Sequence, residues 1–355
     1  MIMNPIPVER TAQSRLSTID FNNLGFGNHI SDHMLVAEYK NGKWHEPKVV
    51  PYGDLAMSPA MLSLHYGQAI FEGMKAFKNK DGELVIFRPQ RHYQRLLKSM
   101  ERMCMPAMSE EFFINSLNAV IKVDEAWVPT SEGSSLYLRP FLFATEARLG
   151  VKISDEYKFI ILTSPVGPYF AKPVRVKVEE HYVRAAEGGT GFAKCAGNYG
   201  GAFYPTQLAK EQGFDQVLWT DARDHQYIDE SGAMNVMFVL NGKLVTPQLT
   251  SAILDGITRN SLLALADKMG ISVEERKVSV AEVKEGFEKG TLTEAFGVGT
   301  AAVVSTIAAI NIAGEEFTFS AVDGNSIQLR LKKKLEDIRH GYEPDEFGWV
   351  YKIPK

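Results

Sequence analysis

Residues 159–183 read FIILTSPVGPYFAKPVRVKVEEHYV, which is two runs typical of β-strands separated by a break. The break, GPYFAKP, contains glycine and proline, and no helical periodicity continues through it. We therefore predict a domain boundary here, with a smaller N-terminal α/β domain at 1–165, an interdomain loop at 166–173 and a larger C-terminal domain at 174–355. Ligands often bind in clefts between domains, so Tyr169 in this loop either lines such a cleft or packs on the surface.

Strand and turn signals lie on both sides of this boundary. Asn41-Gly42 separates LVAEYK from KWHEPKVV, and Asn241-Gly242 separates NVMFVL from KLVTP. Because Asn-Gly readily adopts positive φ, each pair predicts the turn of a β-hairpin. GMKAFK and ELVIFRP predict a third hairpin, and residues 134–145 alternate in the manner of a strand. We therefore expect antiparallel strands in both halves.

Helical periodicity occurs in three further segments. It predicts helices over 91–103, over 110–127 after the N-cap Ser109, and over 258–269 before the stop signal Gly270. With 355 residues and about 150 residues per domain, the chain has room for two domains. The predicted fold class is therefore α/β, in the mixed α+β sense, with two domains.

The composition is that of an ordinary globular protein, with 45% hydrophobic and 23% charged residues. The formal net charge of −4 provides no general attraction to nucleic acid or to an anionic membrane surface. The most apolar stretch, residues 301–313, is shorter than the roughly 18 apolar residues that a membrane-spanning helix needs. We expect no nucleic-acid partner and no membrane segment.

The cysteines and histidines bear on compartment and metal binding. Two cysteines, Cys104 and Cys195, are too few for a disulfide scaffold or a cysteine-based zinc site. The N-terminal sequence MIMNPIPVER lacks the basic start and apolar core of a secretory signal, so we expect a reducing, cytoplasmic location. The eight histidines form no i, i+4 pair with a carboxylate, so no metal is expected.

The segment TGFAKCAGNYGG places Lys194 among small residues and glycines, between Phe192 and Tyr199. Burial of a lysine in such surroundings lowers the pKa of its amine, and a neutral amine can form an imine with a carbonyl cofactor. The alternative is a solvated loop lysine, which is the more common fate of lysines. Composition alone leaves both interpretations open.

Three other segments offer polar residues to a site. YIDESGAMN places Asp229 and Glu230 before an apolar strand, where a carboxylate either protrudes into a site or stays solvated in a turn. GVGT, which ends at Thr300, could approach an anion through its backbone and hydroxyl, although most glycine-rich turns only turn. Arg88 ends the strand VIFRP and is either a surface charge or an anion clamp.

These pieces occur in a definite order along nearly the whole chain. The motifs are SDHML at 31–35, LHYGQAIFEGMKAF at 64–77, FRP with Arg88, YLRP at 137–140, GPYF at 167–170, AKCAGNY with Lys194, QVLWTDARDHQYI at 216–228, DESGAMN with Glu230, DGITRN at 255–260 and GVGT at 297–300. Together they resemble the branched-chain amino acid aminotransferases.

The resemblance implies a pyridoxal 5'-phosphate (PLP) enzyme of fold type IV, a homodimer of two-domain subunits with the cofactor in the interdomain cleft. It implies that Lys194 forms an imine with PLP and then moves the α-proton, and that Tyr199 hydrogen-bonds the phenolic oxygen. Glu230 would keep the ring nitrogen protonated; Asp229 competes for this role on composition alone, and spacing from Gly232 favours Glu230. The residues implied at the phosphate are Arg88, Ile257, Thr258, Gly299 and Thr300.

The implied activity is reversible transfer of an amino group between Leu, Ile or Val and 2-oxoglutarate, which gives branched-chain 2-oxo acids and glutamate. Arg139 matches the family residue that receives the glutamate side-chain carboxylate. The Thr300-Ala301 backbone, with Tyr137, would take the α-carboxylate. The positions that match the apolar wall of the substrate pocket are Phe26, Tyr66, Phe71, Tyr137 and Tyr169.

One departure from some eukaryotic members concerns a redox-sensitive Cys-x-x-Cys, because Ala302 and Ser305 stand at the matching positions. We expect this chain to lack that switch and Cys195 to be a small buried filler. Two rivals remain: another fold-type-IV activity, namely a D-amino acid aminotransferase or an aminodeoxychorismate lyase, and a catalytically silent PLP-binding sensor. Glutamate release from leucine and 2-oxoglutarate would separate these three.

Overall fold

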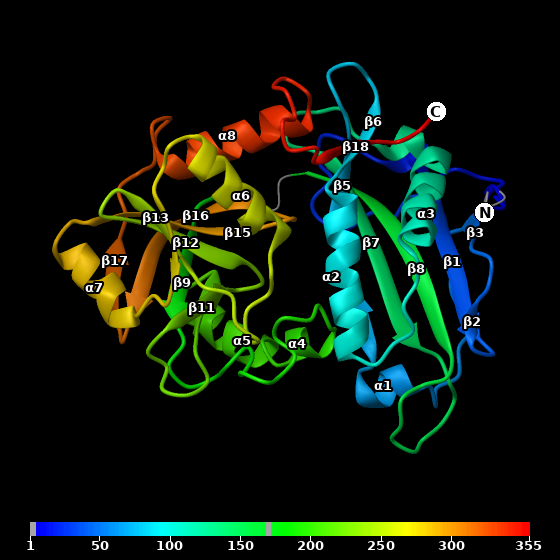
Figure 1. The fold of residues 1–355 in the computed structure, drawn as a ribbon, viewed down its shortest axis with the longest axis horizontal. Coiled ribbons are helices and arrows are strands. Elements are labelled where there is room, and N and C mark those ends of the chain that lie inside the picture. Colours follow the sequence, from blue (N-terminus) through cyan, green and yellow to red (C-terminus); the bar gives the residue numbers. More distant parts are fainter. Residues whose placement is uncertain (1–4, 168–171) are drawn as a thin grey trace. The chain divides into compact units, whose positions relative to one another are not determined.

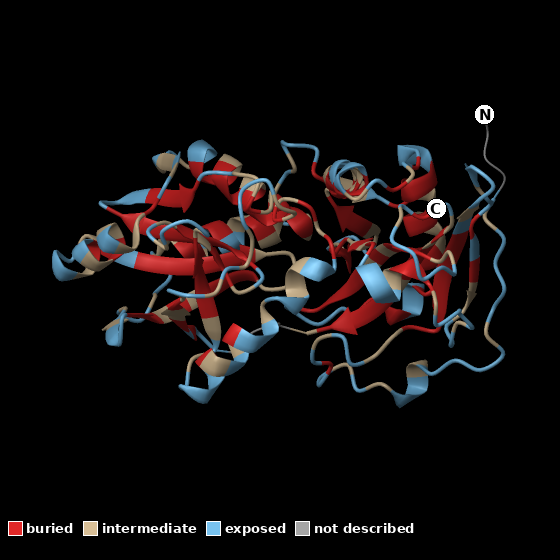
Figure 2. Cartoon of the chain, turned by 90° about the horizontal axis from the view of Figure 1, so that it is seen from below, coloured by how far each residue is buried: buried red, intermediate tan, exposed pale blue. Residues whose placement is uncertain are grey.

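The computed structural model describes residues 5–167 and 172–355, and these divide into two compact units (Figure 1). Unit 1 contains the described residues up to 167, together with Ala193–Ala196 and Arg339–Lys355. Unit 2 contains residues 172–192 and Gly197–Ile338. Each unit has a sheet of its own, and Figure 2 shows that the buried residues follow the strands of both sheets.

Unit 1 combines a sheet with three α-helices among its described residues. Its elements are η1 (Leu16–Thr18), β1 (His33–Lys40), β2 (Lys43–Trp44), β3 (Lys48–Pro51), α1 (Leu62–Tyr66), β4 (Ala69–Phe71), β5 (Met74–Lys78), β6 (Leu84–Phe87), α2 (Pro89–Arg102), α3 (Glu110–Val123), η2 (Glu125–Trp127), β7 (Ser135–Ala144), β8 (Tyr157–Val166) and β18 (Val350–Lys352).

The sheet of unit 1 is antiparallel throughout its described pairs, in the order β18-β6-β5-β7-β8-β1-β2, with β3 paired to β1 and β4 paired to β7. Helix α3 packs on β1 and β8, and α2 packs on α3 and β4. The core that they enclose contains large buried side chains such as Phe113, Trp127 and Phe159. Because α2 lies against β4, residues on the inner face of this helix reach the strand that carries Phe71.

Unit 2 alternates strands and helices. Its elements are β9 (Val174–Val178), α4 (Gly197–Gly200), α5 (Phe203–Glu211), β10 (Gln216–Thr220), β11 (Ile228–Ser231), β12 (Asn235–Leu240), β13 (Lys243–Pro247), α6 (Ile257–Lys268), β14 (Val273–Arg276), α7 (Val280–Glu288), β15 (Leu292–Gly299), β16 (Val303–Ile312), β17 (Glu315–Thr318) and α8 (Ile327–Arg339), of which the last residue belongs to unit 1.

The sheet of unit 2 is mixed. Its order is β11-β10-β9-β16-β15-β12-β13-β14, with β17 paired to β16. Strands β9 and β10 are parallel, as are β13 and β14, and each of these pairs is connected through helical segments, as parallel neighbours require. The other sequential neighbours, such as β12 and β13, form hairpins. Its core is rich in Val, Ile, Leu and Phe.

The three predicted hairpins are confirmed. Asn41 and Gly42 have φ of 54° and 74°, and Asn241 and Gly242 have φ of 52° and 73°, as this turn type requires. Strands β5 and β6 pair antiparallel, and the predicted strand at 134–145 is β7. Both halves therefore contain the expected antiparallel strands, and the parallel pairs of unit 2 are additional to them.

The predicted helices are confirmed with one change of boundary. Ser109 is the N-cap of α3, because its Oγ accepts the N–H of Phe112 at 3.1 Å. The helix expected over 110–127 ends at Val123 and continues only as the short turn η2. Buried Asp124 interrupts it, since its carboxylate accepts hydrogen bonds from the N–H and Nδ1 of His33 at 3.0 and 2.6 Å. A tertiary contact therefore ends this helix.

The observed units differ from the predicted domains in two segments. The described residues pass from unit 1 to unit 2 between 167 and 172, within the predicted loop at 166–173. Ala193–Ala196 and Arg339–Lys355, which the prediction assigned to the C-terminal domain, pack with unit 1. The reason is strand addition: the first segment joins β4, and β18 joins β6. Among the residues that the structure describes, no helix is long and apolar enough to cross a membrane.

Candidate active site

Lys194 lies in a segment of unit 1, Ala193–Ala196, although the chain on either side of this segment belongs to unit 2. The segment runs beside β4 and forms a β-bridge between Ile70 and Cys195. Cys195 is buried in the core of unit 1, as the sequence predicted. The lysine is therefore presented by an extended segment on the edge of a short strand.

Hydrogen bonds hold the main chain of Lys194 on both sides. The N–H of Phe71 in β4 donates to the carbonyl of Lys194 at 3.0 Å, and the N–H of Ala196 donates to the carbonyl of Ala69 at 2.9 Å. The N–H of Lys194 donates to Oγ of Ser99 on α2 at 2.9 Å. One anchor of Lys194 therefore comes from the sheet and the other from a helix.

Five of the predicted site residues gather in unit 1. Nζ of Lys194 and Cζ of Arg139 each lie 4.7 Å from the ring centroid of Phe71. Nη2 of Arg139 donates to Oη of Tyr137 at 3.1 Å, and the rings of Tyr137 and Phe26 meet edge to face with centroids 5.0 Å apart. An amine, a guanidinium and three aromatic rings therefore form one group in unit 1.

Gly73 makes room for this group. A Cβ at this position would stand 2.0 Å from Oη of Tyr137, far inside contact distance. Any larger residue would displace the Tyr137 hydroxyl, which also accepts the hydrogen bond from Arg139. The glycine in the FEGM motif is thus required by a close approach.

Arg88 and Tyr66 lie elsewhere in unit 1. Arg88 precedes α2 with a φ of 51°, and its guanidinium stacks on the ring of Trp349 with Cζ 4.8 Å from the centroid. Tyr66 ends α1, is 42% exposed and donates through its hydroxyl to the carbonyl of Leu149. The predicted residue Tyr169 lies outside the described residues.

A buried charge cluster lies behind Phe71. The next residue, Glu72, is completely buried and forms a two-pronged ion pair with Arg95, with Nε to Oε1 and Nη2 to Oε2 both at 2.8 Å. Nδ1 of His92 is 2.8 Å from Oε2 of the same carboxylate. His92 and Arg95 lie on α2, so the cluster ties this helix to the end of β4.

The protonation states of the cluster follow from its geometry. Burial alone would raise the pKa of Glu72, but the Arg95 guanidinium and the His92 hydrogen bond hold that pKa well below its usual range. Burial, with smaller contributions from the positive charges of Arg95 and Lys194, lowers the pKa of His92 to about 4 against the opposing effect of Glu72. The cluster is therefore an ionised carboxylate, a guanidinium and a neutral imidazole that donates from Nδ1.

In unit 2, Glu230 on β11 is buried, with 3% of its surface exposed, and surrounded by donors. Nε of Arg184 lies 3.1 Å from Oε2, and the N–H of Leu254 donates to Oε1 at 2.8 Å. Nδ2 of Asn235 also donates to Oε1, at 3.3 Å, and bridges to the carbonyl of Leu254 at 2.9 Å. A guanidinium and two hydrogen-bond donors therefore surround this carboxylate.

The neighbouring Asp229 has a different environment. It lines a cavity of about 350 Å³ together with residues that include Tyr227 and Lys277. Burial and the nearby Glu230 raise the pKa of Asp229 to about 7, against the opposing effect of Arg184. Successive strand residues point to opposite faces of a sheet, so only Glu230 reaches Arg184 with its carboxylate.

Helix α6 begins at Ile257, three residues after Leu254, whose N–H contacts Glu230. Ile257 and Thr258 are the first residues of α6, and no side chain in the described part of the chain caps this helix. Its first N–H groups therefore offer donors at the positive end of the helix dipole. Gly256, just before the helix, allows the side chain of Asn235 to lie close to the backbone, because a Cβ at Gly256 would stand 1.9 Å from Oδ1 of Asn235.

The remaining predicted residues of unit 2 are half-buried. Gly299 ends β15, and Thr300 and Ala301 form the turn that leads into β16. The strand therefore includes most of the GVGT motif, which the sequence placed after a strand. Tyr199 lies in α4, five residues after Lys194. The predicted residues are thus divided between the two units.

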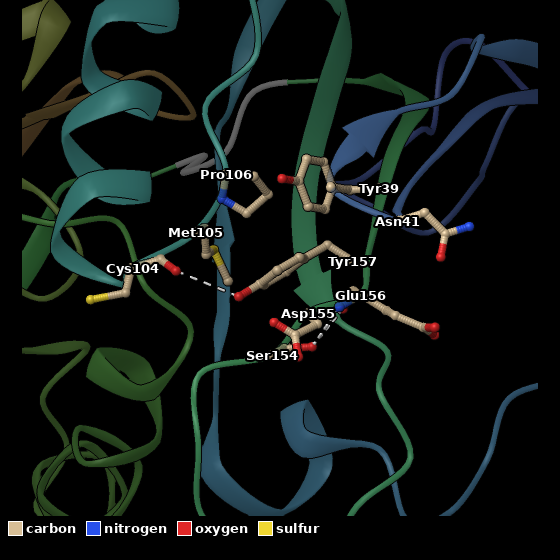
Figure 3. Close-up of a pocket in the computed structure, with 10 residues that line it drawn as sticks. Tyr39, Asn41, Cys104, Met105, Pro106, Ser154, Asp155, Glu156 and Tyr157 are labelled. Carbon is tan, nitrogen blue, oxygen red and sulfur yellow. Dashed lines mark hydrogen bonds between the residues drawn. The ribbon is translucent and has the colours of Figure 1, made fainter.

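A further cavity, of about 490 Å³, opens in unit 1 (Figure 3). Its lining includes Tyr39, Cys104 and Tyr157, and burial raises the pKa of Tyr157 to about 12. Oη of Tyr157 donates to the carbonyl of Cys104 at 3.5 Å and accepts from Nε2 of Gln68 at 3.1 Å. Of the described residues predicted for the site, none lines this cavity.

Comparison with known proteins places the chain in a family. A sequence profile described as amino-transferase class IV matches residues 69–310. The branched-chain-amino-acid aminotransferase 2 of Bacillus subtilis (strain 168) is 43% identical over 357 residues, which cover 99% of this chain and 98% of that protein. The chain belongs to the branched-chain amino acid aminotransferases.

Solved structures of branched-chain aminotransferases confirm the predicted fold class. The Escherichia coli enzyme has a TM-score of 0.74 at 26% identity and covers 90% of this chain and 99% of its own. The enzyme of Thermobaculum terrenum, described as a PLP form, has a TM-score of 0.74 at 22% identity over 91% of this chain and 99% of its own. The α/β fold inferred from the motifs is thus the fold of this family.

Sequence reasoning missed the residues that support the site of this aminotransferase. They are Glu72, His92, Arg95 and Ser99 in unit 1 and Arg184 in unit 2. A signal for the first set exists: His92, Arg95 and Ser99 are spaced three and four apart in a predicted helix, which puts them on one face. Their partner Glu72 is distant in sequence, so the pairing itself had no local signal.

The neutral His92 predicts a specific pH dependence of stability. Its pKa is lower in the folded protein than in the unfolded chain, so the unfolded state binds the proton first and stability falls as pH drops from about 6.5 to about 4. His92→Asn keeps an N–H donor near Glu72 but does not titrate. From pH 7 to pH 5, we expect the free energy of unfolding of the parent to fall by roughly 2 kcal/mol more than that of the variant.

Urea titrations at the two pH values measure this difference. The control is His65→Asn, which replaces an exposed histidine and should leave the parental pH dependence intact. Equal losses in the parent and in His92→Asn would contradict a neutral, buried imidazole.

Proposed function

We propose that this protein catalyses reversible amino transfer between Leu, Ile or Val and 2-oxoglutarate, with PLP as its cofactor. The identity of 43% to a branched-chain aminotransferase over nearly the full length of both chains carries this proposal. It favours the branched-chain activity over a D-amino acid aminotransferase, an aminodeoxychorismate lyase or a silent PLP-binding sensor. Release of glutamate from leucine and 2-oxoglutarate by the purified protein is the direct test.

The donor set of the chain fits this cofactor. Charged and backbone donors are available for a phosphate at Arg88 and at the start of α6, and Glu230 offers a carboxylate to a protonated ring nitrogen. We assign the phosphate to Arg88, Ile257, Thr258, Gly299 and Thr300, and the phenolic oxygen to Tyr199. When bound, PLP supplies a carbonyl carbon that takes up the amino group and a ring that accepts electrons.

Lys194 is assigned the covalent attachment of the cofactor through Nζ. Once its amine is free, Nζ would accept the proton from the α-carbon of the amino acid and pass it on to the cofactor carbon that takes up the amino group. The position of Nζ over the Phe71 ring and the anchored main chain support this role, because the amine extends from a fixed point. Proton transfer requires such a fixed approach.

Glu230 is assigned the ring nitrogen in preference to Asp229. The Arg184 guanidinium lies beside the Glu230 carboxylate, and Leu254 and Asn235 donate hydrogen bonds to it, so this carboxylate is the one positioned to act as an anionic partner of a protonated nitrogen. Burial raises the pKa of Asp229 to about 7, which makes this residue a poorer anion at neutral pH.

We assign substrate binding to Arg139 and the aromatic residues. The apolar wall is formed by Phe26, Tyr66, Phe71, Tyr137 and Tyr169, and the α-carboxylate is assigned to Tyr137 and the Thr300-Ala301 backbone. Among the described residues, no carboxylate pairs with the Arg139 guanidinium, and its buried Nε has no hydrogen-bond partner. This supports Arg139 as the receptor of the glutamate side-chain carboxylate.

Assembly, location and redox behaviour complete the proposal. We propose a homodimer that works in the cytoplasm, as the resemblance implies. Ala302 and Ser305 replace the paired thiols of some relatives, and of the two cysteines only Cys104 is exposed. Oxidation is therefore not expected to switch activity through a disulfide at this loop.

The first prediction from this proposed function concerns Lys194. Borohydride reduction of the yellow holoenzyme, followed by peptide mapping, should label Lys194. Lys194→Ala should bind PLP weakly and release no measurable glutamate, whereas Lys43→Ala, at an exposed position in β2, should behave as the parent. Labelling of another lysine would show that the assignment is wrong.

The second prediction compares the adjacent carboxylates. Glu230→Gln should retain the cofactor yet lose most turnover, because a neutral amide does not hold the ring nitrogen protonated. Asp229→Asn, the matched change one residue away, should keep most of it. Turnover numbers and cofactor occupancy measure both effects. Unchanged turnover in Glu230→Gln would point to Asp229 or to no ring partner.

The third prediction tests dual recognition at Arg139. Loss of one partner of a desolvated charge pair costs roughly 2–5 kcal/mol, so Arg139→Met should lower kcat/KM for glutamate by about 30-fold to several-thousand-fold. Leucine should lose far less, and Arg223→Met, at an exposed site, should alter neither. Single-turnover rates with both amino acids, measured beside a melting curve, decide the matter. Equal losses for leucine and glutamate would exclude dual recognition.

A further inference from the structure

Ser99 stands between the backbone of Lys194 and the interior of unit 1. It lies in the last turns of α2 and is completely buried. Its hydroxyl donates to the carbonyl of Arg95 one turn earlier, at 3.1 Å, and accepts the N–H of Lys194 at 2.9 Å. Because its hydrogen is used within the helix, the hydroxyl oxygen is left to act as the acceptor for Lys194.

The two anchors of Lys194, Phe71 in the sheet and Ser99 in the helix, are connected through the buried charge cluster. Phe71 N–H holds the carbonyl of Lys194, and Glu72 follows Phe71 directly. Glu72 pairs with Arg95 and His92, which lie on the same helix as Ser99. Sheet and helix are thereby linked one residue from the sheet anchor at Phe71 and one helical turn from the helix anchor at Ser99, so α2 and β4 hold Lys194 as a unit.

We propose that Ser99 is a positioning residue for amino transfer, which fixes the main chain of Lys194 through its hydroxyl and so sets the point from which the amine extends. This inference rests on the proposed role of Lys194. Without the acceptor, the partly buried N–H of Lys194 must find another partner, and the segment shifts. A displacement of about 1 Å at a catalytic group costs on the order of 100-fold in rate.

The competing explanation is that Ser99 only packs in the interior and does not position Lys194. Another buried serine of the chain serves as a matched control for this explanation. Ser116 on α3 is also a completely buried helical serine of unit 1, and its hydroxyl has no hydrogen-bond partner among the described residues. A serine that only packs should respond to substitution by alanine in the way that Ser116 does.

The experiment compares the holoenzymes of Ser99→Ala and Ser116→Ala. We expect Ser99→Ala to lower kcat by roughly ten- to hundredfold with little change in KM for leucine, and to shift the pH midpoint of the absorbance band of the lysine-bound cofactor. Ser116→Ala should keep the parental kcat and midpoint. Melting curves of both variants report the purely structural effect.

Two further substitutions keep the test decisive if Ser99→Ala does not fold. Ser99→Thr retains a hydroxyl that can bond both the helix carbonyl and Lys194, and should recover most of kcat. Ser99→Cys places a weak acceptor there and should not. Equal kcat in the Thr and Cys variants would overturn the proposal, as would a parental kcat and midpoint in Ser99→Ala.

Failure of this inference is distinguishable from failure of the proposed function. If borohydride labels Lys194 in every variant and Ser99→Ala is fully active, Lys194 keeps its role and Ser99 has none. If the label falls on another lysine in the parent, the proposed function of Lys194 fails first.

Discussion

The pairing of Ala193–Ala196 with β4 is the interaction on which the rest of the site depends. Four residues leave unit 2, hydrogen-bond to a strand and a helix of unit 1, and return. Because the N–H and the carbonyl of Lys194 are both used, the segment cannot detach without leaving polar backbone groups unpaired, which is costly in a buried setting. The backbone of Lys194 is thereby fixed as firmly as that of a residue within a sheet, although Lys194 lies on a short loop.

The buried charges behind β4 serve this pairing. A completely buried carboxylate is tolerated because Arg95 meets both oxygens of Glu72 and the imidazole of His92 donates a third hydrogen bond. Removal of one partner from such a pair typically costs about 3–5 kcal/mol, since an uncompensated charge remains. The neutral imidazole also means that the cluster adds no net charge beside the amine of Lys194.

In unit 2, the adjacent carboxylates of Asp229 and Glu230 lie in different environments, because successive residues of a strand point to opposite faces of the sheet. Glu230 points to a guanidinium and to backbone and amide donors, while Asp229 lines a cavity where burial favours its protonated form. Burial and the neighbouring Glu230 raise the pKa of Asp229 to about 7, and each pKa unit corresponds to about 1.4 kcal/mol, so this environment strongly disfavours the anionic form of Asp229. Position in the sheet, not residue type, decides which one can serve as the anion.

The sequence by itself determined the local elements and the family. Asn-Gly pairs marked two hairpins, Ser109 marked the start of α3, and the order of motifs from Arg88 to Thr300 identified an aminotransferase. These signals are local, because turn and cap preferences depend on residues a few positions apart. The aromatic and arginine group of unit 1 was also found in this way, through positions matched to the family.

Only the tertiary structure decided which unit holds Lys194, where the C-terminal strand pairs, why α3 stops at Asp124 and what supports Lys194 and Glu230. Each of these depends on a partner distant in sequence: Ser99 for Lys194, Glu72 for Arg95, His33 for Asp124 and Arg184 for Glu230. Periodicity and turn preferences contain no information on such pairings. They arise when buried polar groups are forced to find their hydrogen-bond partners across the fold.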